Sequence, residues 1–88
     1  MMRPRSYMEI IRTVLSVCQK SGVLKTHVMF ECNLNSKQLD FYLGELINRG
    51  LLEKLMIGRW EYRTTEKGRQ FLEGYENVLK LLDEVVAR

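Results

Sequence analysis

The side chains that most often carry out chemistry are few in this chain: two cysteines, Cys18 and Cys32, and a single histidine, His27. Two thiols and one imidazole at these spacings do not make a zinc site, which needs four ligands in closely spaced pairs. Buried apolar thiols are the simpler interpretation of both cysteines, and a disulfide between them is the open alternative. No nucleophile stands beside a base, and no pair of carboxylates can be assigned to a cleft. We therefore expect no enzyme, no metal, no cofactor and no small-molecule substrate.

Charged side chains are the more numerous reactive groups. The chain has 14 Lys and Arg against 11 Asp and Glu, for a net charge of +3. Residues 69–88 hold three basic and four acidic side chains, which leaves eleven basic and seven acidic ones before them. This mild positive charge, concentrated ahead of the tail, is compatible with nucleic acid as a partner but does not require it.

The length of 88 residues suits one domain with one modest core. The composition, 45% hydrophobic and 28% charged, is that of an ordinary globular protein. Apolar runs are short and interrupted by charge, so we expect no membrane-spanning helix. The start of the chain lacks the apolar run and the cleavage site of a signal peptide. We expect a soluble protein of the cytoplasm with no membrane partner.

Three helices are predicted in the first half of the chain, over residues 6–20, 25–32 and 36–48. Apolar side chains recur there every three or four residues, which is the spacing of one helix face. Ser6 and Glu9 have the spacing of a capping box at the start of the first helix.

The start and the end of the third helix are the best-marked boundaries. Asn35 is a good N-cap, and Gln38 stands where its side chain can reach back to the cap. Leu34, an apolar residue in a tight turn, is expected to fill the gap between two helices. Gly50 supplies the stop.

A two-stranded hairpin is predicted next, with strands over 52–57 and 60–64 and a turn near Gly58. In the second strand Glu61 and Arg63 alternate with apolar residues and threonine, so one face of the hairpin is expected to be polar.

The last helix is predicted over 66–87, with Thr65 as its cap. At 1.5 Å per residue it would be roughly 33 Å long, more than a small domain needs. Its apolar residues are spaced by three and four in alternation, which is a heptad seam. The seam residues are Leu72, Tyr75, Leu79, Leu82 and Val86.

Helix, helix, tight turn, helix and hairpin is the element order of a winged helix-turn-helix. The expected fold class is therefore mostly α with a small β-hairpin (α+β), with an extended C-terminal helix. Residues 1–68 would form the winged domain with a basic N-terminal arm. Residues 69–88 would form a dimerisation helix continuous with it.

Several stretches strengthen this interpretation. "NLNSKQLDFYLGELINRGLLEK" resembles a capped recognition helix followed by its stop, and "YRTTEKG" resembles the join between a wing and the last helix. Together with "MEIIRTVLSVC" and "KTHVMFECNL", they make the chain similar to small archaeal winged-helix DNA-binding proteins. These include the dimeric ten-kilodalton chromatin-associated type and related regulators of archaea and archaeal viruses. The resemblance implies DNA binding and, in its longer members, an antiparallel coiled coil of the last helix.

A recognition helix would touch DNA with its first turn and its outer face. The candidates there are Ser36, Lys37, Asp40 and Phe41. Basic residues on the arm, the second helix and the wing could hold phosphates. These candidates are Arg3, Arg5, Lys25, His27, Arg59 and Arg63.

Each of these residues also has an ordinary interpretation. Lys37 can be a solvated lysine, Asp40 would repel phosphate, and Phe41 can belong to a protein contact. No arginine lies on the exposed first half of the third helix, so strong base readout is not evident. Trp60, near the wing tip, is interpreted as part of the wing core, with a base contact as the alternative.

The second half of the heptad seam would run past the domain and expose an apolar stripe, which pairing of two tails would bury. The most favoured hypothesis is thus a homodimeric, nucleoid-associated transcription regulator that binds double-stranded DNA through the helix 36–48 and the wing 52–64. The alternatives are a non-specific chromatin protein and a winged helix that binds another protein.

Overall fold

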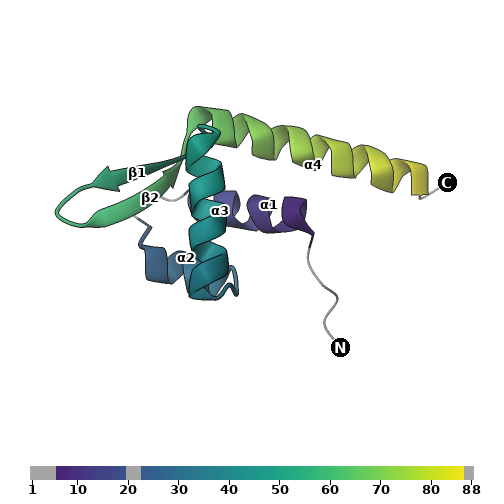
Figure 1. Cartoon of the computed structure of the whole chain (residues 1–88). Coiled ribbons are helices and arrows are strands. Elements are labelled where there is room, and N and C mark those ends of the chain that lie inside the picture. The colour runs from purple at the N-terminus through teal and green to yellow at the C-terminus, as the bar shows by residue number, and fades with distance from the viewer. Residues whose placement is uncertain (1–5, 20–22, 87–88) are drawn as a thin grey trace.

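A computed structural model describes residues 6–19 and 23–86, with the side chains of 84–86 excepted. Four helices and a two-stranded antiparallel sheet follow one another along the chain (Figure 1). They are α1 (Tyr7–Val17), α2 (Lys25–Glu31), α3 (Ser36–Asn48), β1 (Leu52–Met56), β2 (Trp60–Thr64) and α4 (Glu66–Val86). The expected class, mostly α with a small hairpin in winged-helix order, is confirmed.

Most element boundaries agree with the sequence signals. The Ser6 and Asn35 side chains accept hydrogen bonds from the amides of Glu9 and Gln38, and both capping boxes are complete. Leu34 is buried in the turn between α2 and α3, as expected. The first helix ends at Val17, earlier than predicted.

The core lies where α1 meets α2, α3 and the base of the sheet. Val14 and Leu15 of α1 are fully buried, as are Val28 of α2 and Leu46 of α3. Burying such side chains contributes roughly 1.5–3 kcal/mol each relative to exposure. The two cysteines also belong to this core, and neither is joined in a disulfide. The interpretation of both as small buried apolar groups is confirmed.

The hairpin pairs Leu52 with Thr64 at its base and Met56 with Trp60 near its tip. Tyr62 donates its amide proton to the carbonyl of Val23, so residue 23 extends the sheet by one isolated bridge. Figure 1 shows the hairpin reaching out beyond the helices, on the side opposite the far end of α4.

The expected alternation along β2 is wrong near the tip, where Trp60 is 51% exposed and Glu61 is buried. Tyr62 and Thr64 share the face of Trp60 but lie over the core, while Trp60 projects past it. The prediction of Trp60 as wing core is therefore wrong, because the hairpin is longer than the body beneath it.

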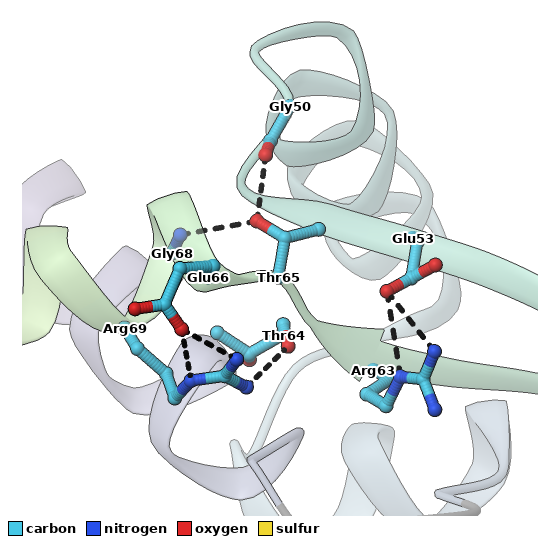
Figure 2. Close-up of polar contacts among 8 residues, drawn as sticks. All are labelled: Gly50, Glu53, Arg63, Thr64, Thr65, Glu66, Gly68 and Arg69. Atoms are coloured by element: carbon cyan, nitrogen blue, oxygen red, sulfur yellow. Dashed lines mark hydrogen bonds and ion pairs between the residues drawn. The ribbon is translucent and has the colours of Figure 1, made fainter.

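The join between the wing and α4 is held by a short polar cluster (Figure 2). The Thr65 hydroxyl donates to the carbonyl of Gly50 at 2.7 Å and accepts from the amide of Gly68 at 3.1 Å. Arg69 bonds the Glu66 carboxylate and the Thr64 carbonyl. Thr65 thus caps α4, as predicted, and also fixes α4 to the end of α3.

Candidate nucleic-acid interface

The outer face of α3 is a solvent-exposed stripe that begins at its capped N-terminus. Because Asn35 and Gln38 complete the capping box, they are committed to the helix start, as expected for Gln38. Ser36 and Lys37 are exposed in the first turn. Among the described residues, no ion pair engages Lys37. Its ammonium group is thus available to an external anion.

The next turn of the stripe combines a charge and an aromatic ring. Asp40 and Phe41 are both exposed, Phe41 to 55%. Gly44 follows one turn later, and a methyl group built there would meet nothing within 4 Å. This part of the helix can therefore be approached closely by a large partner.

Lys25 and Asp40, two of the predicted contact residues, bind each other. Their side chains form an ion pair of 2.6 Å that joins the start of α2 to α3. The hydrogen bond to Asp40 raises the pKa of Lys25 above its ordinary value. Both side chains are about half exposed, so the pair can open when another charged group competes.

Contacts of Tyr7 hold α3 against α1. The rings of Tyr7 and Tyr42 lie 5.7 Å apart, and Phe41 meets Tyr42 edge to face at 5.2 Å. The Tyr7 hydroxyl donates to Glu45 at 2.9 Å, which raises the Tyr7 pKa. Glu45, which is half-buried, is thereby turned toward α1. Tyr7 was missed because nothing local marks a contact between residues so far apart in sequence.

His27 lies apart from the Lys25–Asp40 pair. It follows Lys25 by two residues, or roughly 200° around a helix. It lines a shallow groove with Glu31 and with Ser16 and Val17 of α1. The structure therefore does not bring His27 to the face of α3. Arg3 and Arg5, the predicted basic arm, lie outside the described residues.

The wing arginines are exposed but paired with glutamates. Arg59 lies 3.2 Å from Glu61, and Arg63 lies 3.3 Å from Glu53, the latter pair visible in Figure 2. Both partners of the Arg63–Glu53 pair are partly exposed, and such a pair contributes only about 0–1 kcal/mol, so a phosphate can displace Glu53. Glu61 is buried, so Arg59 would stay bonded to it and meet a phosphate with the exposed part of its guanidinium group. The guanidinium groups remain candidate phosphate ligands.

Lys54, on the facing strand, makes a different contact. Its ammonium group lies 4.5 Å from the centre of the Trp60 ring and 6.0 Å from that of Tyr62. Such cation–π contacts at exposed sites contribute about 0.5–1 kcal/mol. Nothing in the sequence indicated this pairing, because it depends on the strand register.

The apolar face of α4 is partly core and partly open. Leu72 is only 7% exposed and packs in the core, so the open stripe begins after it. Tyr75 and Leu79 are half-buried, and Leu82 is exposed. The side chain of Val86 lies outside the described residues.

A groove of about 590 Å³ runs along this stripe, between α4 and the start of α1. Its lining residues are Met8, Gln70, Phe71, Gly74, Tyr75, Val78, Leu79 and Leu82. The open face therefore includes Val78, which is exposed and is not one of the seam residues predicted from the sequence.

Within the described residues, no helix is long and apolar enough to cross a membrane, and no group of three potential metal ligands comes together.

The winged helix-turn-helix family model matches residues 4–83. The chain belongs to this family. Winged helices are not usually enzymes. An uncharacterized protein of Methanocaldococcus jannaschii is 23% identical over 79 residues, which is 90% of this chain and 78% of the relative.

Solved structures of the same fold include two kinds of DNA-associated protein. Sso10a-2, described as a DNA-binding protein from Sulfolobus solfataricus, is 27% identical, with a TM-score of 0.76. That match covers 94% of this chain and 87% of Sso10a-2. MepR of S. aureus, in a complex with DNA, matches with a TM-score of 0.70 at 14% identity, over 89% of this chain and 60% of MepR. The MepR likeness shows the fold alone. The predicted resemblance to archaeal winged-helix DNA-binding proteins is confirmed.

Proposed function

We propose that this chain binds double-stranded DNA and regulates transcription as a homodimer. In this proposal α3 enters the major groove, and the wing lies on the backbone or in the minor groove. The observation that carries it is the exposed stripe of α3, which starts at Lys37 on a firmly capped helix. The likeness to Sso10a-2, itself described as DNA-binding, supports it. Such a protein would be associated with the nucleoid.

Base contacts would come from the first two turns of α3. Ser36 and Lys37 can donate to base edges, and Phe41 can press on a thymine methyl group. The Asp40 carboxylate can only accept hydrogen bonds from a base. Its negative charge repels phosphate, so it limits where the DNA backbone can approach this face. With no arginine on this half of the helix, discrimination between bases is expected to be modest.

Phosphate contacts would supply much of the affinity. Arg63 can exchange Glu53 for a phosphate, and Lys25 can do so by leaving Asp40. Arg59 can add a phosphate contact while it stays bonded to the buried Glu61. Arg3 and Arg5 would add an arm. His27 would contact the backbone only if DNA also reached the α1–α2 groove.

The proposed dimer is formed through α4. The open groove and the exposed Val78 and Leu82 make an apolar stripe that a second copy of the helix can cover. An antiparallel pairing, as in the longer members that this chain resembles, would present two recognition helices to a two-fold site. Leu72 takes no part, and Tyr75, Leu79, Leu82 and Val86 would carry the contact.

Salt-dependent fluorescence anisotropy on random-sequence duplex DNA tests the proposal. Binding should weaken steeply with salt, and Arg59→Ala should reduce the log–log slope by about one. Lys37→Ala should also reduce discrimination among sequences. Lys80→Ala is the control, because it removes the same charge from an exposed position on α4. Absence of binding at low salt would contradict the proposal.

Selection from a random DNA pool separates a regulator from a general chromatin protein. A sharp consensus supports regulation, whereas tight binding without one supports an architectural role. A protein-binding winged helix is the remaining alternative, favoured by the exposed Phe41 beside Asp40. It would show itself as failure to bind DNA.

A further inference from the structure

The tip of the wing carries a cluster of large apolar side chains in water. Ile57 is 62% exposed, and Met56 and Trp60 are exposed to a similar extent. Isolated exposed apolar residues are common and need no explanation. These three lie together at the tip of the hairpin, however, and none of them packs in the core.

The hairpin geometry holds these side chains together. Met56 and Trp60 are direct partners in the strand register, so their side chains lie side by side on one face. Ile57 donates its amide proton to the carbonyl of Arg59 at 2.9 Å, which closes the turn. Gly58, with φ of +72°, takes the conformation that a side chain would disfavour. The turn is therefore tight, and Ile57 stands at its end.

Positive charge flanks this cluster on β1 and in the turn. Lys54 lies over the Trp60 ring, and the Arg59 side chain is 64% exposed beside the turn. Glu61, the acidic residue that follows Trp60, is largely covered and already bonded to Arg59. A partner that offers an apolar surface between negative groups is therefore favoured. Stacked base pairs between two phosphate backbones always offer an apolar surface between negative charges, whereas a protein surface does so only in special cases.

We infer that the wing tip is a wedge that enters the minor groove and opens a base step, bending the duplex. The inference rests on the proposed DNA binding and goes beyond it. Ile57 enters the step, and Met56 and Trp60 pack against the exposed sugars and base. Arg59 and Lys54 hold the phosphates on either side. Apolar wedges of this kind unstack a step and kink DNA by roughly 20–90°.

The wedge predicts a sequence preference that base contacts do not explain. Pyrimidine–purine steps such as TA unstack most easily, so they should be favoured under the tip. This preference should respond to Ile57 and Met56 and not to Lys37.

Trp60 is the only tryptophan in the chain, so its fluorescence reports on the tip alone. The probe is a duplex of about 30 base pairs with one central TA step and a dye at each end. Titration with the full chain should quench Trp60 emission and shorten the dye-to-dye distance. Ile57→Ala and Met56→Ala should each weaken binding about tenfold, as expected for losing the burial of an aliphatic side chain, and should restore the straight duplex. Phe30→Ala, which removes an exposed aromatic from α2, is the matched control and should change neither reading.

The outcomes separate this inference from the proposed function. Binding with unchanged emission and an unbent duplex overturns the wedge and leaves DNA binding intact. Stronger quenching by single strands than by duplex also overturns it, since the tip would then be a stacking platform. No binding to any DNA overturns both. Circular dichroism and thermal melting of each variant verify that the exposed substitutions leave the fold unchanged.

Discussion

Asp40 is expected to lower the affinity of the proposed DNA interface, although it makes no favourable contact with phosphate. It lies on the exposed face of α3 and neutralises Lys25 across the helix-turn-helix. An approaching phosphate must therefore meet a carboxylate and compete for the ammonium group at once. The stability gained from such an exposed pair is small, about 0–1 kcal/mol, so its larger effect is expected on binding.

Asp40→Asn should therefore bind DNA several-fold more tightly at low salt, with a log–log slope steeper by about one, because Lys25 is released to phosphate. The midpoint of thermal unfolding should hardly change. Anisotropy titrations over a salt series provide the measurement. Asp83→Asn removes the same charge from α4 and serves as the control. Equal gains from the two variants would mean that net charge alone is responsible.

A second single residue, Cys18, is expected to make the free energy of unfolding depend on pH. Burial raises the pKa of its thiol from an ordinary value of 9.0 to about 12, and the nearby Cys32 adds to the shift. Between these values the unfolded chain loses this proton and the folded chain keeps it. The thiol's contribution is thus fully present below pH 9, and the free energy of unfolding should fall by about 1.4 kcal/mol per pH unit above it.

Urea unfolding between about pH 8 and pH 10.5, in the presence of a reductant, measures this slope. Tyrosines and lysines also titrate there, so the informative quantity is the difference from Cys18→Ala. That variant should be less stable at about pH 8 because it leaves a small cavity, but its stability should decline less with pH. Parallel curves for the two proteins would show that the thiol does not carry the dependence.

At the scale of the elements, the join between wing and α4 determines where the long helix points. Gly68 packs so closely that an added Cβ would lie 2.3 Å from the carbonyl oxygen of Leu51 and 2.6 Å from Cγ2 of Thr64. Both neighbours are firmly held, since Thr64 donates to the carbonyl of Leu15 and Leu51 accepts from the amide of Thr65. Neither can easily move away.

Gly68→Ala should therefore destabilise the fold by about 1–3 kcal/mol, although alanine is the better helix former by about 1 kcal/mol. Chemical denaturation gives the free energy of unfolding. Gly44→Ala, on the exposed face of α3, is the matched control and should be neutral or up to about 1 kcal/mol stabilising. A stable Gly68→Ala variant would mean that α4 can shift away from Leu51.

Local signals in the sequence were sufficient to predict the elements, because caps and turns act within a few residues. The capping boxes at Ser6 and Asn35 and the cap at Thr65 are all present. The same signals could not show how far the hairpin extends beyond its core, so Trp60 was misassigned. The Lys25–Asp40 and Tyr7–Glu45 pairs join residues 15 and 38 apart, and only tertiary packing brings them together.

At the scale of the whole molecule, wing and tail project in opposite directions from the helical body (Figure 1). The longest dimension of the chain is 52 Å. The proposed nucleic-acid contacts lie on α3 and the hairpin, and the open apolar stripe lies on α4. Pairing through α4 would therefore leave both wings free, and a dimer could hold two DNA segments or two half-sites without rearrangement.

The proposed pairing predicts which face of α4 forms the dimer contact. Leu82 belongs to the open groove, whereas Leu81, which is exposed to a similar extent, lies roughly 100° around the helix and is absent from the groove lining. A buried, unpaired carboxylate is strongly unfavourable, so Leu82→Glu should shift the chain to monomer. Leu81→Glu should leave the dimer intact. Sedimentation equilibrium of the two variants and the unchanged chain provides the measurement. Equal masses for all three would place any dimer contact elsewhere. A dimer lost through Leu81→Glu alone would place it on a different face of α4.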